Sequence, residues 1–283
     1  MKKGWLIYTE YEACRNEFFI GKLTSAARKY GLELKLLLRE KIALSVENGH
    51  TALVYEGKKQ NDACFAVMRV NDFTLSFQLE KGGLRVFNRA ETAQICNDKY
   101  LSYLFANSLE IPTLDTFLID KNTSGWQDVN KNLFPLVAKP LDGKGGKDVL
   151  MLDTYGDFLS MAKNYGDRFL LQKVAGNRGV DVRAYCIGGR FFTAIKRASL
   201  TDFRSNYCLG GIAEPFVPDK NLIQIIEKIL SNLKTDYVGI DFVFDDGEPY
   251  FNEMEDAVGA RTVYNLTDLD PADAFIKYVS QNI

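Results

Sequence analysis

The chain has 283 residues, of which 46% are hydrophobic and 25% are charged, and its formal net charge is -2. These values are typical of a globular protein with one large core or two to three lobes, and they argue against a broad surface for nucleic acids or anionic membranes. No segment is long and apolar enough to span a membrane, and the short apolar run from Trp5 to Tyr8 soon meets acidic residues, unlike a signal peptide. We therefore expect a cytoplasmic protein without nucleic-acid or membrane partners.

The histidine and cysteine content argues against several kinds of site. The single histidine, His50, lies in a polar stretch, so we expect it at the surface, because a metal site or a catalytic triad needs convergent partners. The five cysteines are widely scattered, odd in number and without a CxxC pair, which predicts reduced thiols and neither disulfides nor a zinc knuckle. They are Cys14, Cys64, Cys96, Cys186 and Cys208.

The N-terminal part of the chain has the pattern of a small α/β domain. Residues 4–10 read as a buried strand, and residues 16–31 read as an amphipathic helix closed by Gly31. Residues 32–38 and 63–72 then read as two further strands. Strand, helix and strand in this order predict a parallel sheet.

The rest of the chain changes in character. Residues 73–88 predict a helix with a Gly-Gly stop and then a strand, and residues 89–119 predict two helical pieces and a strand. From residue 134 onward, strands separated by glycine turns favour antiparallel sheet, with one amphipathic helix at residues 219–234. We place domain boundaries near residues 88 and 172. The predicted regions are 1–88, 89–172 and 173–283.

A glycine-rich loop follows an apolar strand that ends in Lys139. Glycines let backbone N–H groups turn toward an anion, and a lysine supplies charge for phosphate oxygens. The loop lacks the GK[ST] ending of a Walker motif, and no helix follows it; a plain hairpin turn is the alternative interpretation. Its glycines are Gly143, Gly145 and Gly146.

Residues 169–185 combine an apolar strand with a polar bend. Such a strand can give backbone hydrogen bonds to an adenine edge while its apolar residues cover the ring, and Asp181 can then reach a ribose hydroxyl. An ordinary core strand is the alternative. The residues we assign to nucleotide binding in this segment are Gln172, Lys173, Val174, Asp181 and Arg183.

Three carboxylates lie on two successive strands near the C-terminal end. Glu253 and Glu255 are two residues apart and share a face of one strand, while Asp241 lies on the preceding strand. Converging carboxylate oxygens suit Mg²⁺, although a solvated acidic face is the alternative. For Asp241 and Glu253 to share a face we expect a three-residue turn at 246–248, because a two-residue Asp-Gly turn shifts Glu253 to the other face.

In this order, these features resemble the RimK-type ATP-grasp carboxylate–amine ligases, which include ribosomal-protein glutamate ligases and LysX ligases. Residues 97–113, NDKYLSYLFANSLEIPT, are similar to the family's DK…L…GIP segment. Residues 202–206, DFRSN, repeat its most specific motif, and GIDFVFDDGEPYFNEME at 239–255 is similar to its metal-binding strands. The resemblance spans roughly residues 65 to 260.

The resemblance implies an α/β ATP-grasp fold: a Rossmann-like pre-ATP-grasp domain followed by two antiparallel α+β lobes that grip ATP. The implied cofactors are ATP and Mg²⁺, with two metal ions expected and Mn²⁺ as an alternative metal. It implies that Arg204 binds the transferred phosphate, with Arg197 and Asn206 beside it, and that Lys99 and Lys139 hold phosphates. We expect the loop at 142–148 to order over bound ATP as a lid.

Some departures from the family pattern concern the acceptor side. Glu255 stands where the family usually has Asn, residues 256–264 replace its Pro-Gly bend, and residues 207–211 lack a basic residue. We therefore expect a ligase that joins a carboxylate to an amine through an acyl-phosphate, with small-molecule or peptide substrates left open. The alternatives are a ligase that tailors or macrocyclises a peptide or protein, and a non-catalytic nucleotide sensor. A homodimer or homotetramer is the expected assembly.

Overall fold

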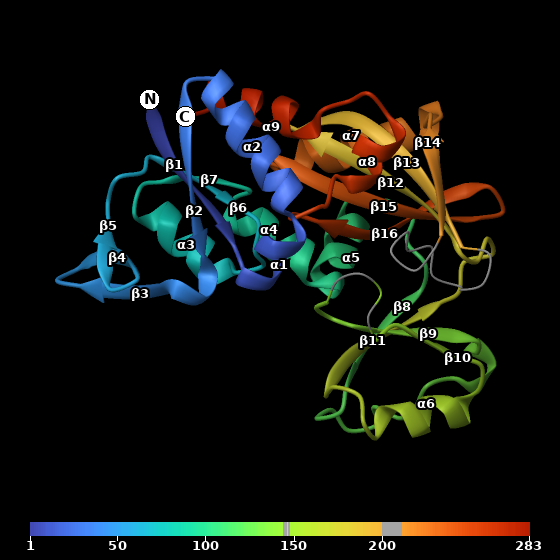
Figure 1. The fold of residues 1–283 in the computed structure, drawn as a ribbon. Coiled ribbons are helices and arrows are strands. Elements are labelled where there is room, and N and C mark those ends of the chain that lie inside the picture. The colour runs from blue at the N-terminus through green and yellow to red at the C-terminus, as the bar shows by residue number, and fades with distance from the viewer. Residues whose placement is uncertain (144–145, 147, 200–210) are drawn as a thin grey trace.

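The structure, a computed structural model, describes residues 1–143, 146, 148–199 and 211–283. Three bodies are visible in Figure 1: the N-terminal region on the left, a small green sheet at the lower right, and a larger orange sheet above it. The two ends of the chain lie side by side, and Lys2 Nζ donates to the carbonyl of Ile283 at 2.7 Å. The predicted division of the chain at residues 88 and 172 stays a prediction.

The N-terminal body contains a four-stranded parallel sheet, so the parallel pairing predicted for this region is confirmed. Its strand order is β2-β1-β6-β7. The strands are β1 (Lys2–Tyr8), β2 (Leu32–Leu38), β6 (Phe65–Met68) and β7 (Arg85–Phe87). The helices of this body are α1 (Glu10–Arg15), α2 (Glu17–Lys29) and α3 (Phe73–Lys81). Gly31 follows α2 with a φ of 72°, the left-handed conformation expected of the residue that closes a helix.

A second, three-stranded antiparallel sheet in this body was not predicted. It consists of β3 (Ile42–Glu47), β4 (His50–Tyr55) and β5 (Lys58–Gln60), and a 3-10 turn at Arg39–Lys41 precedes it. Its two turns, Asn48-Gly49 and Glu56-Gly57, have positive φ at both residues, as type I′ hairpin turns require. His50 begins β4 and is exposed, as predicted.

The central body is a four-stranded antiparallel sheet with the order β10-β9-β11-β8. Its strands are β8 (Thr116–Asp120), β9 (Leu136–Pro140), β10 (Leu150–Leu152) and β11 (Arg168–Lys173), and a 3-10 turn lies at Lys131–Leu133. Helix α6 (Tyr155–Ala162) packs Phe158 into the core of this body, against Trp126, Phe134 and Phe169. A capping box of Thr154 and Asp157 fixes the start of that helix.

The C-terminal body is a five-stranded antiparallel sheet with the order β14-β13-β12-β15-β16. Its strands are β12 (Val180–Ile187), β13 (Arg190–Ala198), β14 (Ile212–Phe216), β15 (Tyr237–Asp245) and β16 (Glu248–Glu255). The helices around it are α4 (Ala90–Asn97), α5 (Lys99–Ser108), α7 (Lys220–Asn232), α8 (Arg261–Leu266) and α9 (Pro271–Gln281). Successive residues of a strand point to opposite faces. Tyr185 belongs to one buried apolar cluster and its neighbour Ala184 to another, so apolar cores cover both faces of this sheet.

One apolar core joins the N-terminal and C-terminal bodies. Tyr185 and Tyr237 of the five-stranded sheet share a buried cluster with Phe65 and Phe87 of the parallel sheet. Helices α2 and α9 lie side by side in Figure 1, and Lys29 pairs with Asp273 between them at 2.6 Å. The parallel sheet is therefore held firmly against the sheet that carries the three carboxylates.

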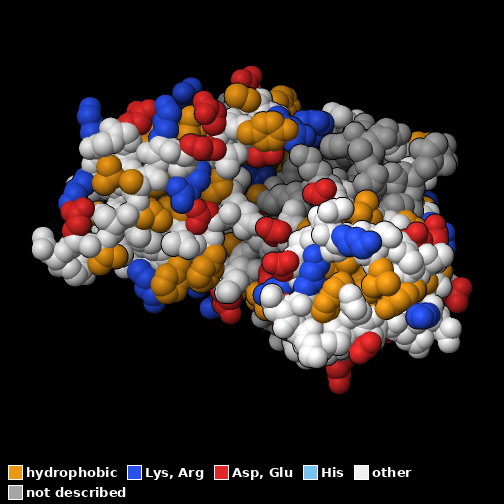
Figure 2. All heavy atoms as spheres, turned by 90° about the horizontal axis from the view of Figure 1, so that it is seen from below, with side chains coloured by type: hydrophobic (Ala, Val, Ile, Leu, Met, Phe, Trp, Pro, Cys, Tyr) orange, Lys and Arg blue, Asp and Glu red, His pale blue; other side chains and the backbone are white. Residues whose placement is uncertain are grey.

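Two further features are the mixed charge of one face and the state of the described cysteines. Figure 2 shows acidic and basic side chains interspersed over the face of the molecule seen from below. Cys14, Cys64, Cys96 and Cys186 form no disulfide, and Cys208 lies outside the described residues. Within the described part of the chain, the helices are all too short or too polar to cross a bilayer.

Candidate active site

A cleft lies between the central sheet and the five-stranded sheet. It brings together nine of the residues predicted to bind nucleotide or transferred phosphate. These are Lys99, Lys139, Gly143, Gly146, Gln172, Lys173, Val174, Asp181 and Arg197. Three other predicted residues, Gly145, Arg204 and Asn206, lie outside the described residues, as do parts of the predicted lid.

The lining of this cleft combines apolar and basic side chains. Leu114, Val137, Val174 and Val243 contribute apolar surface, and the strand ends of β9 and β11 deliver Lys139 and Lys173. The apolar surface suits a flat ring and the lysines suit anionic groups, so the cleft fits a ligand that carries both. That is the combination expected for a nucleotide.

The three predicted metal ligands converge beside this cleft. Asp241, Glu253 and Glu255 each offer a carboxylate oxygen, and these oxygens all lie within 4.8 Å of one another. Asp241 and Glu253 face each other directly across β15 and β16, and Gly239 faces Glu255. The expectation that the three side chains meet on one face is confirmed.

The predicted three-residue turn between these strands is wrong. Asp245 pairs with Glu248, so the turn contains only Asp246 and Gly247, whose φ angles are 48° and 85°. Such a type I′ turn fits the twist of antiparallel strands, which is why Asp-Gly adopts it here. If the strands paired regularly all the way from this turn, Asp241 would face Asn252, and the Glu253 side chain would point to the other face of the sheet.

A β-bulge at Asn252 restores the face of Glu253. The pairing is regular from Asp245 to Phe242, which faces Phe251, and then shifts so that Asp241 faces Glu253. Asn252 is the extra residue that this shift leaves unpaired in the ladder. The bulge therefore places Glu253 on the same face as Asp241, which the longer turn was expected to do.

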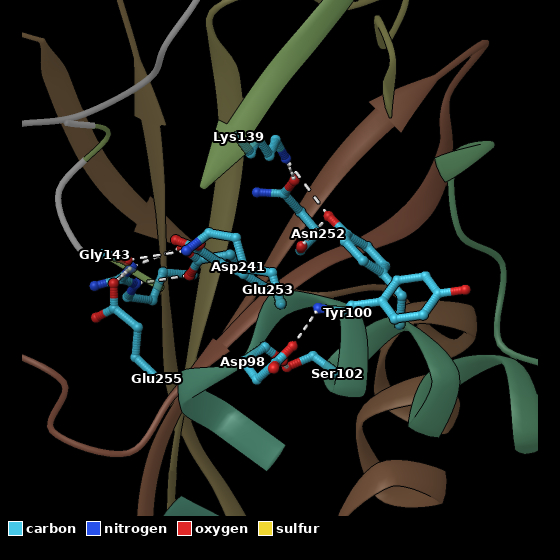
Figure 3. A network of polar contacts seen from close by, with 12 residues as sticks. Asp98, Tyr100, Ser102, Lys139, Gly143, Asp241, Asn252, Glu253 and Glu255 are labelled. Atoms are coloured by element: carbon cyan, nitrogen blue, oxygen red, sulfur yellow. Dashed lines mark hydrogen bonds and ion pairs between the residues drawn. The ribbon is translucent and has the colours of Figure 1, made fainter. Parts of the chain in front are cut away.

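The bulged residue is held by two other elements (Figure 3). Lys139 of β9 points toward Asn252, and its Nζ donates to the Asn252 side-chain oxygen at 2.8 Å. Tyr103 of α5 donates its hydroxyl to the Asn252 carbonyl, and the Tyr103 oxygen lies 3.5 Å from Lys139 Nζ. Neither Asn252 nor Tyr103 was predicted as a site residue; the position of Asn252 directly before Glu253 was the available signal.

Two buried arginines bind Asp241. Arg183 donates from Nε and Nη2 to the two carboxylate oxygens, each at 2.6 Å, and Arg197 donates from Nη2 at 2.8 Å. Burial alone raises the pKa of Asp241, but its attraction to Arg183 and Arg197 outweighs burial and lowers the pKa to about 2. Asp241 is therefore an anion that anchors both guanidinium groups.

Each arginine also reaches a second carboxylate. Arg183 lies 3.0 Å from Glu255, and although it was predicted to bind nucleotide, it contacts the predicted metal ligands and does not line the cleft. Arg197 donates to both oxygens of Asp181, at 2.7 and 2.5 Å. Asp181 thus orients Arg197 at the cleft wall, and its predicted contact with a ribose hydroxyl stays a prediction.

Glu253 differs from Asp241 in its surroundings. Its ion-pair partner among the described residues is Lys99, whose Nζ lies 3.6 Å from a Glu253 carboxylate oxygen. Burial raises the pKa of Glu253, and the nearby charges of Asp241 and Glu255 raise it further against the opposing effect of Lys99. A partly buried carboxylate of this kind gains from a nearby cation, so the donor set fits a divalent metal with oxygen ligands.

The lysines of the site are also partly buried. Lys99 Nζ donates to the Gly143 carbonyl at 2.9 Å, which ties the start of α5 to the glycine loop. Asp98 caps α5 by accepting from the backbone N–H groups of Tyr100 and Leu101. Burial lowers the pKa of Lys139 to about 8, although the surrounding carboxylates oppose this change.

Comparison with known proteins agrees with this geometry. The RimK-like ATP-grasp domain matches residues 96–279 of the chain. The chain belongs to the RimK-like ATP-grasp family. This match begins later and ends later than the resemblance seen in the sequence, and it includes both the cleft and the three carboxylates.

Similar proteins include a probable alpha-L-glutamate ligase from Rhodopirellula baltica, 26% identical over 277 residues that cover 93% of this chain and 68% of that one. The RimK domain ATP-grasp protein of Sphaerobacter thermophilus has a TM-score of 0.73 at 18% identity, covering 98% of this chain and 99% of that one. A RiPP-associated ATP-grasp ligase of Chryseobacterium gregarium, solved with ADP and a leader and core peptide, has a TM-score of 0.70 at 16% identity, covering 100% and 96%.

These findings confirm the ATP-grasp fold and the reaction class. The chain is an ATP-grasp ligase of the class that forms an amide bond between a carboxylate and an amine. ATP-grasp ligases use ATP and magnesium, and the similar ligase PsnB was solved with Mg and ADP. The non-catalytic sensor considered from the sequence is therefore disfavoured.

Proposed function

We propose that ATP binds in the cleft with its adenine at the Gln172–Val174 strand end and its phosphates at Lys99, Lys139 and Arg197. The observation that carries this assignment is the position of the three carboxylates: Glu253 lines the same cleft as Lys99 and Lys139. Asp241, Glu253 and Glu255 would hold the metal, and phosphates held by these lysines would lie beside it. Bound magnesium would neutralise charge on the phosphates and on the group being transferred.

The reaction proposed for this site has two steps. An oxygen of the substrate carboxylate attacks the γ-phosphorus of ATP, the bond to the β-phosphate oxygen breaks, and ADP leaves. The amine nitrogen then attacks the acyl carbon, phosphate leaves with the bonding electrons, and the nitrogen gives up a proton. The residues of the chain hold the reacting groups: Lys139 exchanges Asn252 for a phosphate oxygen, and Arg197, fixed by Asp181, presents a second cation.

A smaller cavity adjoins the cleft, and we propose that the substrates meet there. It shares Lys99, Gly143 and Glu253 with the nucleotide cleft. Glu255 and the amide side chains of Asn71 and Asn97 also line it. This polar lining suits polar groups of the substrates, with the acyl group directed toward the phosphates.

The substrates are small molecules or groups on a peptide. The test uses purified protein with ATP and Mg²⁺. One set of reactions contains pairs of amino acids, and a second set contains peptides plus amino acids, so that small-molecule and peptide substrates are both tried. The expected result is phosphate release together with a product whose mass equals the two substrates minus one water. Product formation only with peptides assigns a peptide-modifying ligase, whereas failure to bind ATP or ADP in the presence of Mg²⁺ contradicts the assignment of the cleft.

A further inference from the structure

The chain segment that follows Glu255 is held by side chains from distant parts of the sequence. Arg69 Nη2 donates to the Val258 carbonyl at 2.6 Å. Asn88 Nδ2 donates to the Asp256 carbonyl at 3.1 Å, and Asn97 Nδ2 donates to the Asp256 carboxylate at 3.1 Å. Arg69 and Asn88 precede the part of the chain that matches the RimK-like domain.

Arg69 is a buried cation in a fixed orientation. It follows β6 at the carboxyl end of the parallel sheet, and only 7% of its surface is exposed. Its Nε lies 3.3 Å from the Tyr8 hydroxyl, and its guanidinium carbon lies 5.3 Å from the centre of the Phe19 ring and 5.5 Å from that of Tyr237. Because burying a charge is costly, such an arrangement calls for a function beyond filling space.

Val258 connects this arginine to the carboxylates. A methyl group added at Gly239 would lie 2.6 Å from a Val258 side-chain carbon and 3.4 Å from the Arg183 side-chain stem. Val258 and Arg183 therefore share the space above Gly239, which itself faces Glu255 across the strands. A shift of Val258 changes the room available to Arg183, the residue that bridges Asp241 and Glu255.

We propose that Arg69 is a positioning residue for the metal site: by holding Val258 it fixes the Arg183 bridge and the end of β16, and so the geometry of Asp241 and Glu255. The proposal rests on the proposed metal-binding function of these carboxylates. Through this contact the N-terminal parallel sheet sets the metal affinity of a site that lies in the C-terminal body. Groups that orient metal ligands without touching the metal often control its affinity in this way.

The test is Mn²⁺ binding to the full chain in the presence of ADP, read from the electron paramagnetic resonance signal of free Mn²⁺. Arg69→Met keeps an apolar stem and loses the donor, so Mn²⁺ affinity falls about tenfold or more. Arg69→Lys keeps a donor for the Val258 carbonyl and recovers part of the affinity. Affinity for ADP without metal, measured in EDTA, stays at the wild-type value in both variants.

A matched control separates this effect from loosening of the two bodies. Lys29→Met breaks the exposed ion pair with Asp273, which also joins the N-terminal and C-terminal bodies, and leaves Mn²⁺ affinity unchanged. If Arg69→Met does not fold, Arg69→Lys decides, and it then shows weaker Mn²⁺ binding than the wild-type chain. Wild-type Mn²⁺ affinity in the folded Arg69 variants overturns the proposal; absence of Mn²⁺ binding by the wild-type chain with ADP overturns the proposed metal site itself.

Discussion

Asp241 and Glu253 lie opposite each other because Asn252 is an extra residue in β16. The same bulge turns Asn252 toward Lys139, so one irregularity both aligns the acidic pair and supplies a partner for the lysine. Bulges often re-aim side chains next to active sites, and this one links the hairpin that carries the three carboxylates to the strand that ends at the glycine loop.

The two guanidinium groups on Asp241 make this carboxylate a stability determinant as well as a candidate metal ligand. Asp241→Asn leaves Arg183 and Arg197 buried with one charged partner fewer each, and we expect a loss of about 3 kcal/mol in the free energy of unfolding. Urea denaturation of the metal-free protein measures it. The control is Glu214→Gln, which breaks the exposed pair with Lys196 and should cost no more than about 0.5 kcal/mol. Equal stability of the two variants would show that the buried network is not formed.

Two glycine substitutions should have opposite effects on stability. Gly239→Ala places a methyl group 2.6 Å from buried Val258, so the free energy of unfolding should fall by about 1–3 kcal/mol. Gly21 lies in α2 with open space around it, so Gly21→Ala should raise that free energy by up to about 1 kcal/mol. Thermal or urea unfolding of both variants checks the signs. A neutral Gly239→Ala would mean that Val258 does not pack against this strand.

The lowered pKa of Lys139 leads us to expect that the protein takes up protons when it binds a nucleotide. Burial lowers its pKa to about 8, so near pH 8 a sizeable fraction of the free protein carries a neutral amine. Phosphate oxygens favour the charged form, so ADP binding raises the pKa of Lys139 and takes up protons. Calorimetry at pH 8 in buffers of different ionisation enthalpy measures this uptake.

Substitution identifies the group responsible for that uptake. Lys139→Ala should abolish it and weaken ADP binding, whereas Lys196→Ala, which removes an exposed lysine, should change neither. The lowered pKa of Lys139 also makes the stability depend on pH. Between a pH of about 8 and the ordinary lysine pKa of 10.5, the unfolded state binds more protons than the folded state. The free energy of unfolding therefore rises with pH through that range, because the cost of burying the charged form of Lys139 is lost. Uptake that persists in Lys139→Ala assigns the proton elsewhere.

Many residues of the site could be predicted from the sequence, but the register of the strand pair β15–β16 could not. The even spacing of Glu253 and Glu255 and the strand before Asp241 are local patterns. The bulge depends on what Lys139 and Tyr103 contribute from other elements, so the sequence favoured a longer turn instead. Arg69 acts on a carbonyl 189 residues away, a contact that no local pattern reveals.

The most direct test of the metal site is Mn²⁺ binding to the wild-type protein and to Glu253→Gln, each in the presence of ADP. Glu253 lines the nucleotide cleft and lies among three carboxylates, so the neutral amide should lower Mn²⁺ affinity more than about tenfold. ADP binding in EDTA should remain, because Lys99 and Lys139, the lysines proposed to hold the phosphates, are unchanged. Wild-type Mn²⁺ affinity in Glu253→Gln would contradict a metal site at Asp241, Glu253 and Glu255.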